Sequence, residues 1–565
     1  MGYDADLETL RGGARSWASL PLSRKIELLA ACRAATGRCA EGWTRAAALA
    51  KGTAATPIEG EERLAGPWAL ISALNHFLRT LAEIERFGSP ALDPRRVRVR
   101  RSGQTVVDVF PSDGYDRVLL NGLRAEVWMD PELDASDLRE TMAVSYRSDA
   151  APRVTLVLGA GNVASIPALD VLYRLVAMRS VCLLKLNPVA EYLGPFLEES
   201  LAPLIDGGYL RVAYGDAEAG AYLCAHPLVD EIHVTGSART HDAIVFGGGA
   251  EGAQRKARGE PISHKPISSE LGCVSPTIVV PGRWSDADVR FQAEHIATQK
   301  LHNDGFDCIS LQVLVLPAHW DRTQALLDAV AGVMRTQPDR PAYYPGALER
   351  YRRLASGRAS LQRFGRDGDG FVPRAILSVD AADTAEPAFS SEAFCPLLAV
   401  TTLPGDLETY LREAVSFANE RLWGTLGANL LVDPGTMRAH ASAIDRAIAD
   451  LRYGCIGVNA WAGVAFLLSP VPWGAYPGST PADIGSGTGV VHNTQLFSRS
   501  QKSVLYAPFA PFPRGIFSGQ TTLMPKPPWF VTHRNQNALA RALCRLELSR
   551  SLPRRRATAR SRSPL

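Results

Sequence analysis

The stretch RVTLVLGAGNVASIPALDVLYRLVAMRSVCLLKLNP, residues 153–188, decides the fold of this chain. It begins with a short apolar run that ends in a glycine-containing turn at residues 159–161. A segment with apolar side chains at helical spacing follows, and a second apolar run covers residues 180–188. Strand, turn, helix and strand in this order predict a parallel βαβ unit.

The same alternation continues toward the C-terminus. A helix is predicted over residues 190–205, and short apolar runs at 210–215 and 229–237 predict two more strands. A second series then begins, with a helix over 287–302 and a strand over 311–317 among its first elements. The chain is therefore predicted to be an α/β protein with doubly wound parallel sheets.

The flanking segments show other patterns. Residues 1–90 have apolar positions at helical spacing and predict helices, whereas residues 95–135 alternate and predict strands. The glycine- and charge-rich stretch 246–261 is interpreted as a surface loop. The aromatic- and proline-rich stretch 500–535 is interpreted as a further loop.

Composition and charge exclude several classes of protein. The 565 residues are 46% hydrophobic and 21% charged, which is typical of a globular protein and excludes a mostly disordered chain. The net charge is +3, yet the last 25 residues hold eight arginines against one glutamate. The rest of the chain is slightly acidic, so its charge argues against nucleic-acid binding. Residues 536–565 are predicted to be a basic, flexible tail, with weak adhesion to anions or membrane surfaces as the alternative.

The cysteines indicate the compartment. Their number, nine, is odd, and the chain has no CxxC pair and no cluster of histidines. This argues against a disulfide framework and a zinc site, so no metal is predicted and a reducing, cytoplasmic location is expected. The N-terminal residues include acids and no apolar run, so no signal peptide is predicted. No run of about 18 apolar residues is free of charges, so no transmembrane segment is predicted.

Two turns at strand ends are candidates for a nucleotide site. The turn 159–162 (GAGN) nearly matches a dinucleotide-binding fingerprint, but the next strand ends in Lys185 instead of the acid that would hold a ribose. The turn at Gly236 and Ser237 exposes backbone N–H groups that suit a pyrophosphate. Ordinary βα turns are the alternative for both.

Further segments carry reactive or polar side chains. Glu270 precedes a glycine turn ahead of an apolar strand. Cys308 ends the sequence HNDGFDC, a polar bend that can lower a thiol pKa and supply an N–H group to an oxyanion. A surface glutamate and an inert buried cysteine are the alternatives. The segments 391–396 (SEAFCP) and 454–459 (GCIGVN) complete the set.

The order of these motifs resembles the aldehyde dehydrogenase superfamily. The segments GAGN, VTGS, ELGCVSP, NDGFDC and EAFCP stand where that family has its active-site asparagine and its FTGS, ELGGKSP, NxGQxC and ExFGP motifs. The gap of 23 residues from Asn162 to Lys185 also suits the family, and the resemblance runs from about residue 15 to residue 495. It implies the family's fold, with two doubly wound parallel-sheet domains and an oligomerisation arm.

The resemblance also implies a reaction. Cys308 is expected to attack the aldehyde carbon as a thiolate, while the Asn162 amide and the Cys308 backbone N–H hold the oxyanion. Loss of hydride leaves a thioester, and Glu270 is expected to act as general base on the water that releases a carboxylic acid.

The hydride acceptor implied by the resemblance is NAD or NADP. Lys185 is expected at the adenosine ribose, with Gly236 and Ser237 near the pyrophosphate. Glu392 is expected at the nicotinamide ribose and Phe394 beside the nicotinamide. Pro188 stands where the family often has an acid after the lysine, which leaves the choice between NAD and NADP open.

Other departures from the family pattern affect the walls of the site. Cys273 and Cys395 replace glycines, and these thiols are either redox-sensitive groups near the site or packing residues. Phe306 replaces the family's glutamine and makes one wall apolar. Together with Trp461 and Phe466 it favours an apolar aldehyde, whose identity the sequence does not give.

Two alternative functions stay open. Glu270 favours hydrolysis, because coenzyme-A-acylating relatives commonly lack this acid. A coenzyme-A-acylating aldehyde dehydrogenase or acyl-CoA reductase is the first alternative. A catalytically inactive binding relative is the second, since the departures gather at the cofactor site.

The resemblance implies a division of the chain. Residues 1–273, returning at about 455–490, are expected to form the NAD(P)-binding domain, and residues 274–454 the catalytic domain. Residues 133–151 and part of 485–535 are expected to be the oligomerisation arm of a homodimer or homotetramer. A monomer with these segments packed on itself is the alternative.

Overall fold

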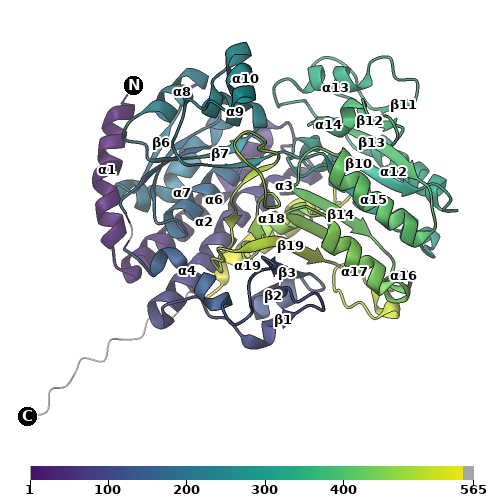
Figure 1. The fold of residues 1–565 in the computed structure, drawn as a ribbon, viewed down its shortest axis with the longest axis horizontal. Helices are drawn as coiled ribbons and strands as arrows, with labels where there is room; N and C mark the ends of the chain where they lie inside the picture. Colours follow the sequence, from purple (N-terminus) through teal and green to yellow (C-terminus); the bar gives the residue numbers. More distant parts are fainter. Residues whose placement is uncertain (1, 150, 552–565) are drawn as a thin grey trace, which may run out of the picture.

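The chain folds into two lobes, each built on its own β-sheet with helices on both faces (Figure 1). The computed structural model describes residues 2–149 and 151–551. The α/β class and the parallel sheets predicted from the sequence are confirmed.

The smaller sheet has the strand order β17-β8-β7-β4-β5-β6 among the described residues. Its strands are β4 (Val154–Leu158), β5 (Val181–Lys185), β6 (Leu210–Ala213), β7 (Glu231–Gly236), β8 (Ile267–Leu271) and β17 (Gly487–Thr488). Only the last is antiparallel to its neighbour. The chain runs outward from β4 to β6 and returns to pair β7 with β4. The carboxyl ends of β4 and β7 therefore flank a topological switch point, where ligands bind in open α/β sheets.

Helices cover this sheet on both faces. They are α6 (Ile166–Val176), α7 (Gly194–Asp206), α8 (Ala217–Ala225), α9 (Ala238–Phe246) and α10 (Gly249–Arg258), with the N-terminal helices α1 (Tyr3–Ser19), α2 (Leu22–Ala50), α3 (Gly60–Arg63) and α4 (Ala69–Phe87). Every residue of α6 is buried, because β4 and β5 contact one side and α4 contacts another. None of the helices in the described ranges is long and apolar enough to cross a membrane.

The larger sheet has the order β1-β2-β3-β19-β15-β14-β9-β10-β13-β12-β11 within the described ranges. Its strands are β1 (Val97–Val99), β2 (Thr105–Phe110), β3 (Arg124–Met129), β9 (Ser275–Val279), β10 (Leu311–Pro317), β11 (Leu361–Phe364), β12 (Arg374–Ser378), β13 (Leu397–Leu403), β14 (Gly427–Leu431), β15 (Cys455–Val458) and β19 (Ser500–Tyr506). The strands from β19 to β12 run parallel. Helices α11 (Asp286–Leu301), α12 (Thr323–Thr336), α13 (Ala347–Ala355), α15 (Leu407–Arg421) and α17 (Ala441–Asp450) flank them.

Parts of two segments interpreted as loops are regular structure. Helix α10 occupies most of the stretch 246–261 and ends at Gly259, whose positive φ of 67° suits a helix C-terminus. Strand β19 occupies residues 500–506 and pairs with β3 on one side and β15 on the other. Burial of its apolar side chains outweighs the loop-like composition of the residues that follow.

The stretch 455–490 divides between the two sheets. Strand β15 pairs with β14 in the larger sheet, whereas β17 pairs with β8 in the smaller one. The stretch 133–151 contains short 3-10 turns and lies beside the C-terminal segment through a bridge between Met142 and Phe497.

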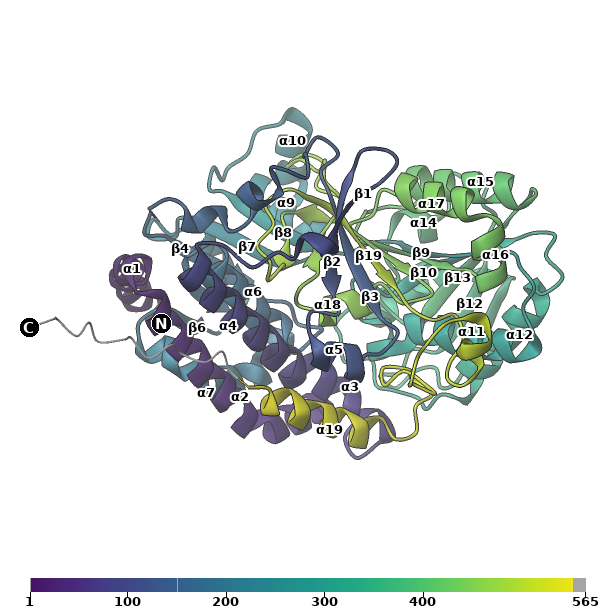
Figure 2. The same ribbon diagram turned by 90° about the horizontal axis from the view of Figure 1, so that it is seen from below.

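The expectation of a flexible tail from residue 536 onward is wrong for residues 536–549. They form helix α19 (Gln536–Ser549), which contacts α2, α3 and α4 and lies along one side of the molecule (Figure 2). Leu543 and Cys544 are buried there, and Arg550 forms ion pairs of 2.7 Å with Asp116 and 2.9 Å with Glu547. Part of the positive charge is therefore neutralised inside the fold. Residues 552–565 of the predicted tail lie outside the described residues.

Candidate active site

The loop between α11 and β10 presents Cys308. Asn303, Asp304 and Gly305 adopt positive φ angles of 49°, 54° and 76°, which turns the chain sharply before the strand. Glycine is required at 305, because a Cβ atom there would lie 2.7 Å from the carbonyl oxygen of Cys395. Seven of the nine cysteines are buried, and only Cys224 and Cys308 are partly exposed. The turn thus makes Cys308 an accessible thiol.

Negative charge surrounds this thiol. Burial raises the pKa of Cys308 well above its ordinary value, and the carboxylates of Glu392, Asp307 and Glu270 raise it further. The backbone N–H of Cys308 opposes them. The resting thiol is therefore protonated at neutral pH, and a reaction through the thiolate needs a base or an added positive charge.

This raised pKa gives a testable pH dependence. The rate at which iodoacetamide alkylates Cys308 is expected to rise about tenfold per pH unit from pH 7 to pH 9, because the thiolate fraction rises in that proportion below the pKa. Mass spectrometry of the peptide that carries Cys308 measures the rate, and the peptide that carries Cys224 is the internal control. A rate that is constant above pH 7 would contradict the raised pKa.

Asn162 lies beside the Cys308 loop. It follows β4 at the switch point, and its side-chain Nδ2 donates a hydrogen bond of 2.9 Å to the carbonyl oxygen of Phe306. An amide nitrogen carries two hydrogens, so a second N–H is available to a substrate. The structure thus brings two predicted site segments, the turn after β4 and the Cys308 loop, into direct contact.

Glu270 is buried on β8, opposite Thr235 of β7 in the strand register. Burial raises the pKa of Glu270 well above its ordinary value, and nearby Asp170 raises it further, while Arg174 and Trp473 lower it. Its Oε1 atom has no hydrogen-bond partner among the residues that the structure describes. A buried carboxyl with a raised pKa and an unused oxygen has the properties of a general base.

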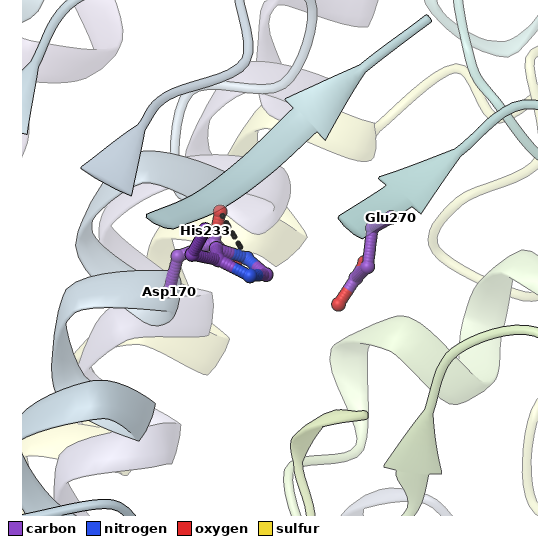
Figure 3. Close-up of side chains that lie close together, drawn as sticks. All are labelled: Asp170, His233 and Glu270. Atoms are coloured by element: carbon purple, nitrogen blue, oxygen red, sulfur yellow. Dashed lines mark ion pairs between the residues drawn. The ribbon is translucent and has the colours of Figure 1, made fainter. Parts of the chain in front are cut away.

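A polar cluster lies behind Glu270 that the sequence analysis missed. Single oxygen or nitrogen atoms of Asp170, His233 and Glu270 lie within 4.8 Å of one another (Figure 3). His233 Nε2 is 3.5 Å from Asp170, and the other ring nitrogen lies 2.9 Å from the Arg174 guanidinium. The Arg174 guanidinium is the positive charge that lowers the pKa of Glu270, against the raising effects of burial and Asp170. No sequence motif indicates this cluster, because its residues come from three separate elements.

Glu392 packs against the turn after β8. A Cβ atom at Gly272 would lie 1.7 Å from Glu392 Oε2, so glycine is required there. Burial raises the pKa of Glu392 to about 8, against the lowering effects of the Cys273 backbone N–H, Lys300 and Arg350. Its Oε1 is buried and accepts no hydrogen bond from any residue in the described ranges. A ligand hydroxyl would satisfy this atom.

Aromatic rings line the same side of the Cys308 loop. Phe394 has a φ of 41°, and its ring lies 4.9 Å from that of Tyr344 and 5.9 Å from that of Phe306. Phe306 is fully buried and also meets Tyr343 at 5.0 Å. The expected apolar wall at Phe306 is therefore part of an aromatic group.

Lys185, Gly236 and Ser237 lie at the carboxyl ends of β5 and β7, the two strands that pair with β4 on either side. Lys185 ends β5, and burial lowers its pKa while the carboxylates of Glu191 and Asp216 oppose the change. Gly236 and Ser237 are exposed, and Ser237 caps α9 by accepting a hydrogen bond of 3.2 Å from the backbone N–H of Thr240. A helix N-terminus that follows a strand end of a parallel sheet is a common place for a phosphate group.

Other residues of the motifs have packing roles. The Asn459 side chain bonds to the backbone N–H and carbonyl of Val432, at 2.8 and 2.9 Å. Cys273 and Cys395 are fully buried. Trp461 donates a hydrogen bond of 3.1 Å to the carbonyl oxygen of Ile309, directly after Cys308.

Comparison with known proteins shows to which family the chain belongs. The sequence profile of the aldehyde dehydrogenase family matches residues 189–479, more than half of the chain. The chain belongs to the aldehyde dehydrogenase family. The resemblance noted from the sequence motifs is thereby confirmed.

Two curated relatives are named as dehydrogenases of unsaturated aldehydes. Geranial dehydrogenase from Castellaniella defragrans is 26% identical over 271 residues, which cover 45% of this chain and 50% of the relative. Coniferyl aldehyde dehydrogenase from a Pseudomonas species is 27% identical over 191 residues, 34% of this chain and 36% of the relative. The matches thus span half or less of these relatives.

Solved aldehyde dehydrogenases share the fold over most of their length. The NAD-dependent enzyme from Sinorhizobium meliloti has a TM-score of 0.58 at 17% identity and covers 90% of this chain and 87% of its own. The NADP-dependent glyceraldehyde-3-phosphate dehydrogenase from Bacillus halodurans, solved with NADP, has a TM-score of 0.59 at 16% identity, covering 89% and 90%. Both cofactors occur among the structural neighbours.

Proposed function

We propose that this chain oxidises an aldehyde to a carboxylic acid with NAD or NADP, through a thioester on Cys308. The observation that carries the proposal is the hydrogen bond of 2.9 Å from Asn162 to the carbonyl of Phe306. It holds an amide donor against the loop of a partly exposed cysteine whose pKa responds to the charge of Glu270. These contacts support a nucleophile, an oxyanion donor and a base that act together.

The proposed steps use these three residues. The Cys308 thiol releases its proton to solvent, its sulfur bonds to the aldehyde carbon, and the carbonyl oxygen becomes an oxyanion. The second N–H of Asn162 and the Cys308 backbone N–H stabilise that charge. As the oxyanion collapses to a thioester, the carbon gives up a hydride, which bound NAD(P) would accept. Glu270 takes a proton from water, the hydroxide adds to the thioester, and the acid and the thiol of Cys308 are released.

The cofactor fits the residues at the switch point. When bound, NAD(P) supplies the hydride acceptor and a positive charge on its nicotinamide ring. Glu392, with its unpartnered buried oxygen, would hold a ribose hydroxyl near the thiol, and Phe394 would pack beside the ring. Gly236 and Ser237 would bind the pyrophosphate, and Lys185 the adenosine ribose. A positive charge placed next to Cys308 would lower the raised thiol pKa.

An apolar aldehyde is the proposed substrate class. The rings of Phe306, Tyr343, Tyr344 and Phe394 form an aromatic group beside the Cys308 loop, and Trp461 donates a hydrogen bond to the same loop. The two curated relatives are named for aldehydes that are apolar and conjugated. Such substrates suit walls of this composition.

The product and the cofactor test this proposal. Purified protein is incubated with geranial, coniferyl aldehyde or a short polar aldehyde, each with NAD and with NADP, and with or without coenzyme A. We expect stoichiometric carboxylic acid and reduced cofactor from the apolar aldehydes, with no requirement for coenzyme A. Acyl-CoA as the product would contradict hydrolysis by Glu270. Failure to bind either cofactor, measured by nicotinamide fluorescence, would indicate an inactive relative.

The proposal includes the domain division and the cellular setting. Residues 1–273, apart from the strands β1–β3 that join the larger sheet, would bind the cofactor together with the return that carries β17, and the larger sheet would carry the nucleophile. The segment 133–151 and part of 485–535 would contribute to a homodimer or homotetramer. Free cysteines throughout the chain favour a reducing cytoplasm.

A further inference from the structure

The backbone carbonyl oxygen of Asn162 accepts hydrogen bonds from three side chains. Lys51 Nζ donates to it at 2.8 Å and Asn303 Nδ2 at 3.1 Å, and the Tyr343 hydroxyl lies 3.1 Å away. Lys51 follows the end of α2, Asn303 belongs to the Cys308 loop and Tyr343 lies in the segment before α13. Three distant parts of the chain therefore meet at one peptide group next to the proposed oxyanion donor.

The three donors also contact one another. Asn303 Oδ1 lies 3.1 Å from Lys51 Nζ and 3.1 Å from the Tyr343 hydroxyl. The Tyr343 proton is thus shared between two acceptors, and the Lys51 ammonium lies 5.3 Å from the centre of the Tyr343 ring. A carbonyl accepts through two lone pairs, so the oxygen of Asn162 is saturated and its peptide plane is held from several directions.

Holding Lys51 in this place has an energetic cost. Its side chain is only 4% exposed, and its counter-ion Glu62, at 3.0 Å, is 3% exposed. Removing such a pair from water costs several kcal/mol per ion before attraction is counted, and apolar residues of the same size are often as stabilising. Stability alone is therefore a weak reason for the pair.

The Asn303 amide connects both ends of Asn162 to the nucleophile loop. Its Nδ2 lies 3.1 Å from the Asn162 carbonyl oxygen, 3.2 Å from the Phe306 carbonyl oxygen and 3.0 Å from Asp307 Oδ1. The Phe306 carbonyl is also the acceptor of the Asn162 side-chain amide. The orientation of the amide relative to Cys308 is thus determined by one connected set of hydrogen bonds.

We infer that Lys51, Tyr343 and Asn303 are positioning residues that fix the Asn162 peptide, so that its second amide N–H meets the aldehyde oxygen as charge develops there. The inference rests on the proposed function, because it assigns a geometric role to residues around the proposed oxyanion donor. Oxyanion donors act through preorganisation, and small displacements reduce their contribution strongly. None of the three needs to touch the substrate.

The cleanest test removes one hydroxyl. Tyr343→Phe is expected to slow acylation about 3- to 30-fold, measured as the rate of the first turnover of NAD(P)H in a stopped-flow instrument, with little change in KM for the aldehyde. Tyr410→Phe is the matched control, because the Tyr410 hydroxyl also donates to a backbone carbonyl, that of Val315 at 3.0 Å, away from Cys308. The control should lower Tm at least as much and leave acylation unchanged.

A paired substitution tests Lys51 without leaving a buried charge. Lys51→Met combined with Glu62→Gln removes both ions and keeps their approximate shapes. We expect a loss of acylation rate larger than that of Tyr343→Phe, about 10- to 100-fold, with cofactor binding by nicotinamide fluorescence retained. If this variant does not fold, Tyr343→Phe still decides the question.

A double-mutant cycle separates positioning from a general loss of structure. In an Asn162→Ala background, Tyr343→Phe should cause no further loss, since the amide to be positioned is gone. If Tyr343→Phe has its full effect in that background, or no effect in the wild-type chain, the inference is overturned. If Asn162→Ala itself leaves acylation unchanged, the proposed role of Asn162 fails instead, so the two failures are distinguishable.

Discussion

Replacing Cys308 with alanine is expected to lower aldehyde oxidation about 10⁴-fold or more, to the background of the assay, because no other residue supplies the sulfur that carries the acyl group. Cofactor binding should persist, since Lys185, Gly236, Ser237 and Glu392 are unchanged. Steady-state formation of NAD(P)H measures the loss, and nicotinamide fluorescence measures the retained binding.

The control for this variant is Cys224→Ala. Cys224 is the other partly exposed cysteine, at the end of α8, so the same substitution there tests for a general effect of removing an accessible thiol. It should leave turnover unchanged. Normal turnover by Cys308→Ala would end the proposal of a thioester enzyme, whatever the remaining residues do.

Glu270→Gln is expected to trap the reaction after its first half. Acylation should still release about one equivalent of NAD(P)H per site in a burst, while steady-state turnover falls about 10²- to 10⁴-fold for lack of the base. Intact-protein mass spectrometry should then find the acyl group on the protein. In the wild-type protein the slow step should speed up as pH rises and Glu270 deprotonates, whereas the variant should lack this dependence.

The stability of the Glu270→Gln variant provides an internal check. Because the pKa of Glu270 is raised in the folded state, its contribution to stability is lost as pH rises through that pKa. Glutamine removes this loss, so Tm at pH 8 should equal or exceed that of the wild type. Glu231→Gln, at the opposite end of neighbouring β7, is the matched control and should keep normal turnover. A slow variant with a lowered Tm and no burst would contradict a base role.

Much of the smaller sheet could be predicted from the sequence because its signals are local. The strand, turn and helix at residues 153–180 correspond to β4 and α6, and the apolar run that follows corresponds to β5. Each element has its own apolar periodicity, and parallel pairing follows from the order of strands and helices. The residues at the carboxyl ends of these strands therefore lie at one edge of the sheet, as expected.

The elements that the sequence misassigned depend on distant partners. Strand β19 is a strand because β3 and β15 leave a gap of one strand between them, and α19 is ordered because α2, α3 and α4 offer it an apolar face. Strand β3 and the three helices lie more than 300 residues before the elements that they contact, and local periodicity does not reveal such partners. Tertiary packing decided both.

Prediction of the site residues from the sequence has the same limit. Cys308, Glu270 and Asn162 stand in recognisable motifs, whereas Lys51, His233 and Tyr343 are single residues in otherwise ordinary segments. Their roles come from hydrogen bonds across 35 or more residues of sequence in each case. A buried lysine at a helix end has no signature that distinguishes it from a solvated one.

The position of β19 has a consequence for synthesis on the ribosome. The chain emerges from its N-terminus, so the hairpin strands β1–β3 and all the central strands are available long before residues 500–506 leave the exit tunnel. Until then β3 and β15 each have one edge that lacks its partner strand β19. A nascent chain that stalls before residue 500 would expose both edges to other chains, so the larger of the two described sheets is complete only once residues 500–506 have been made.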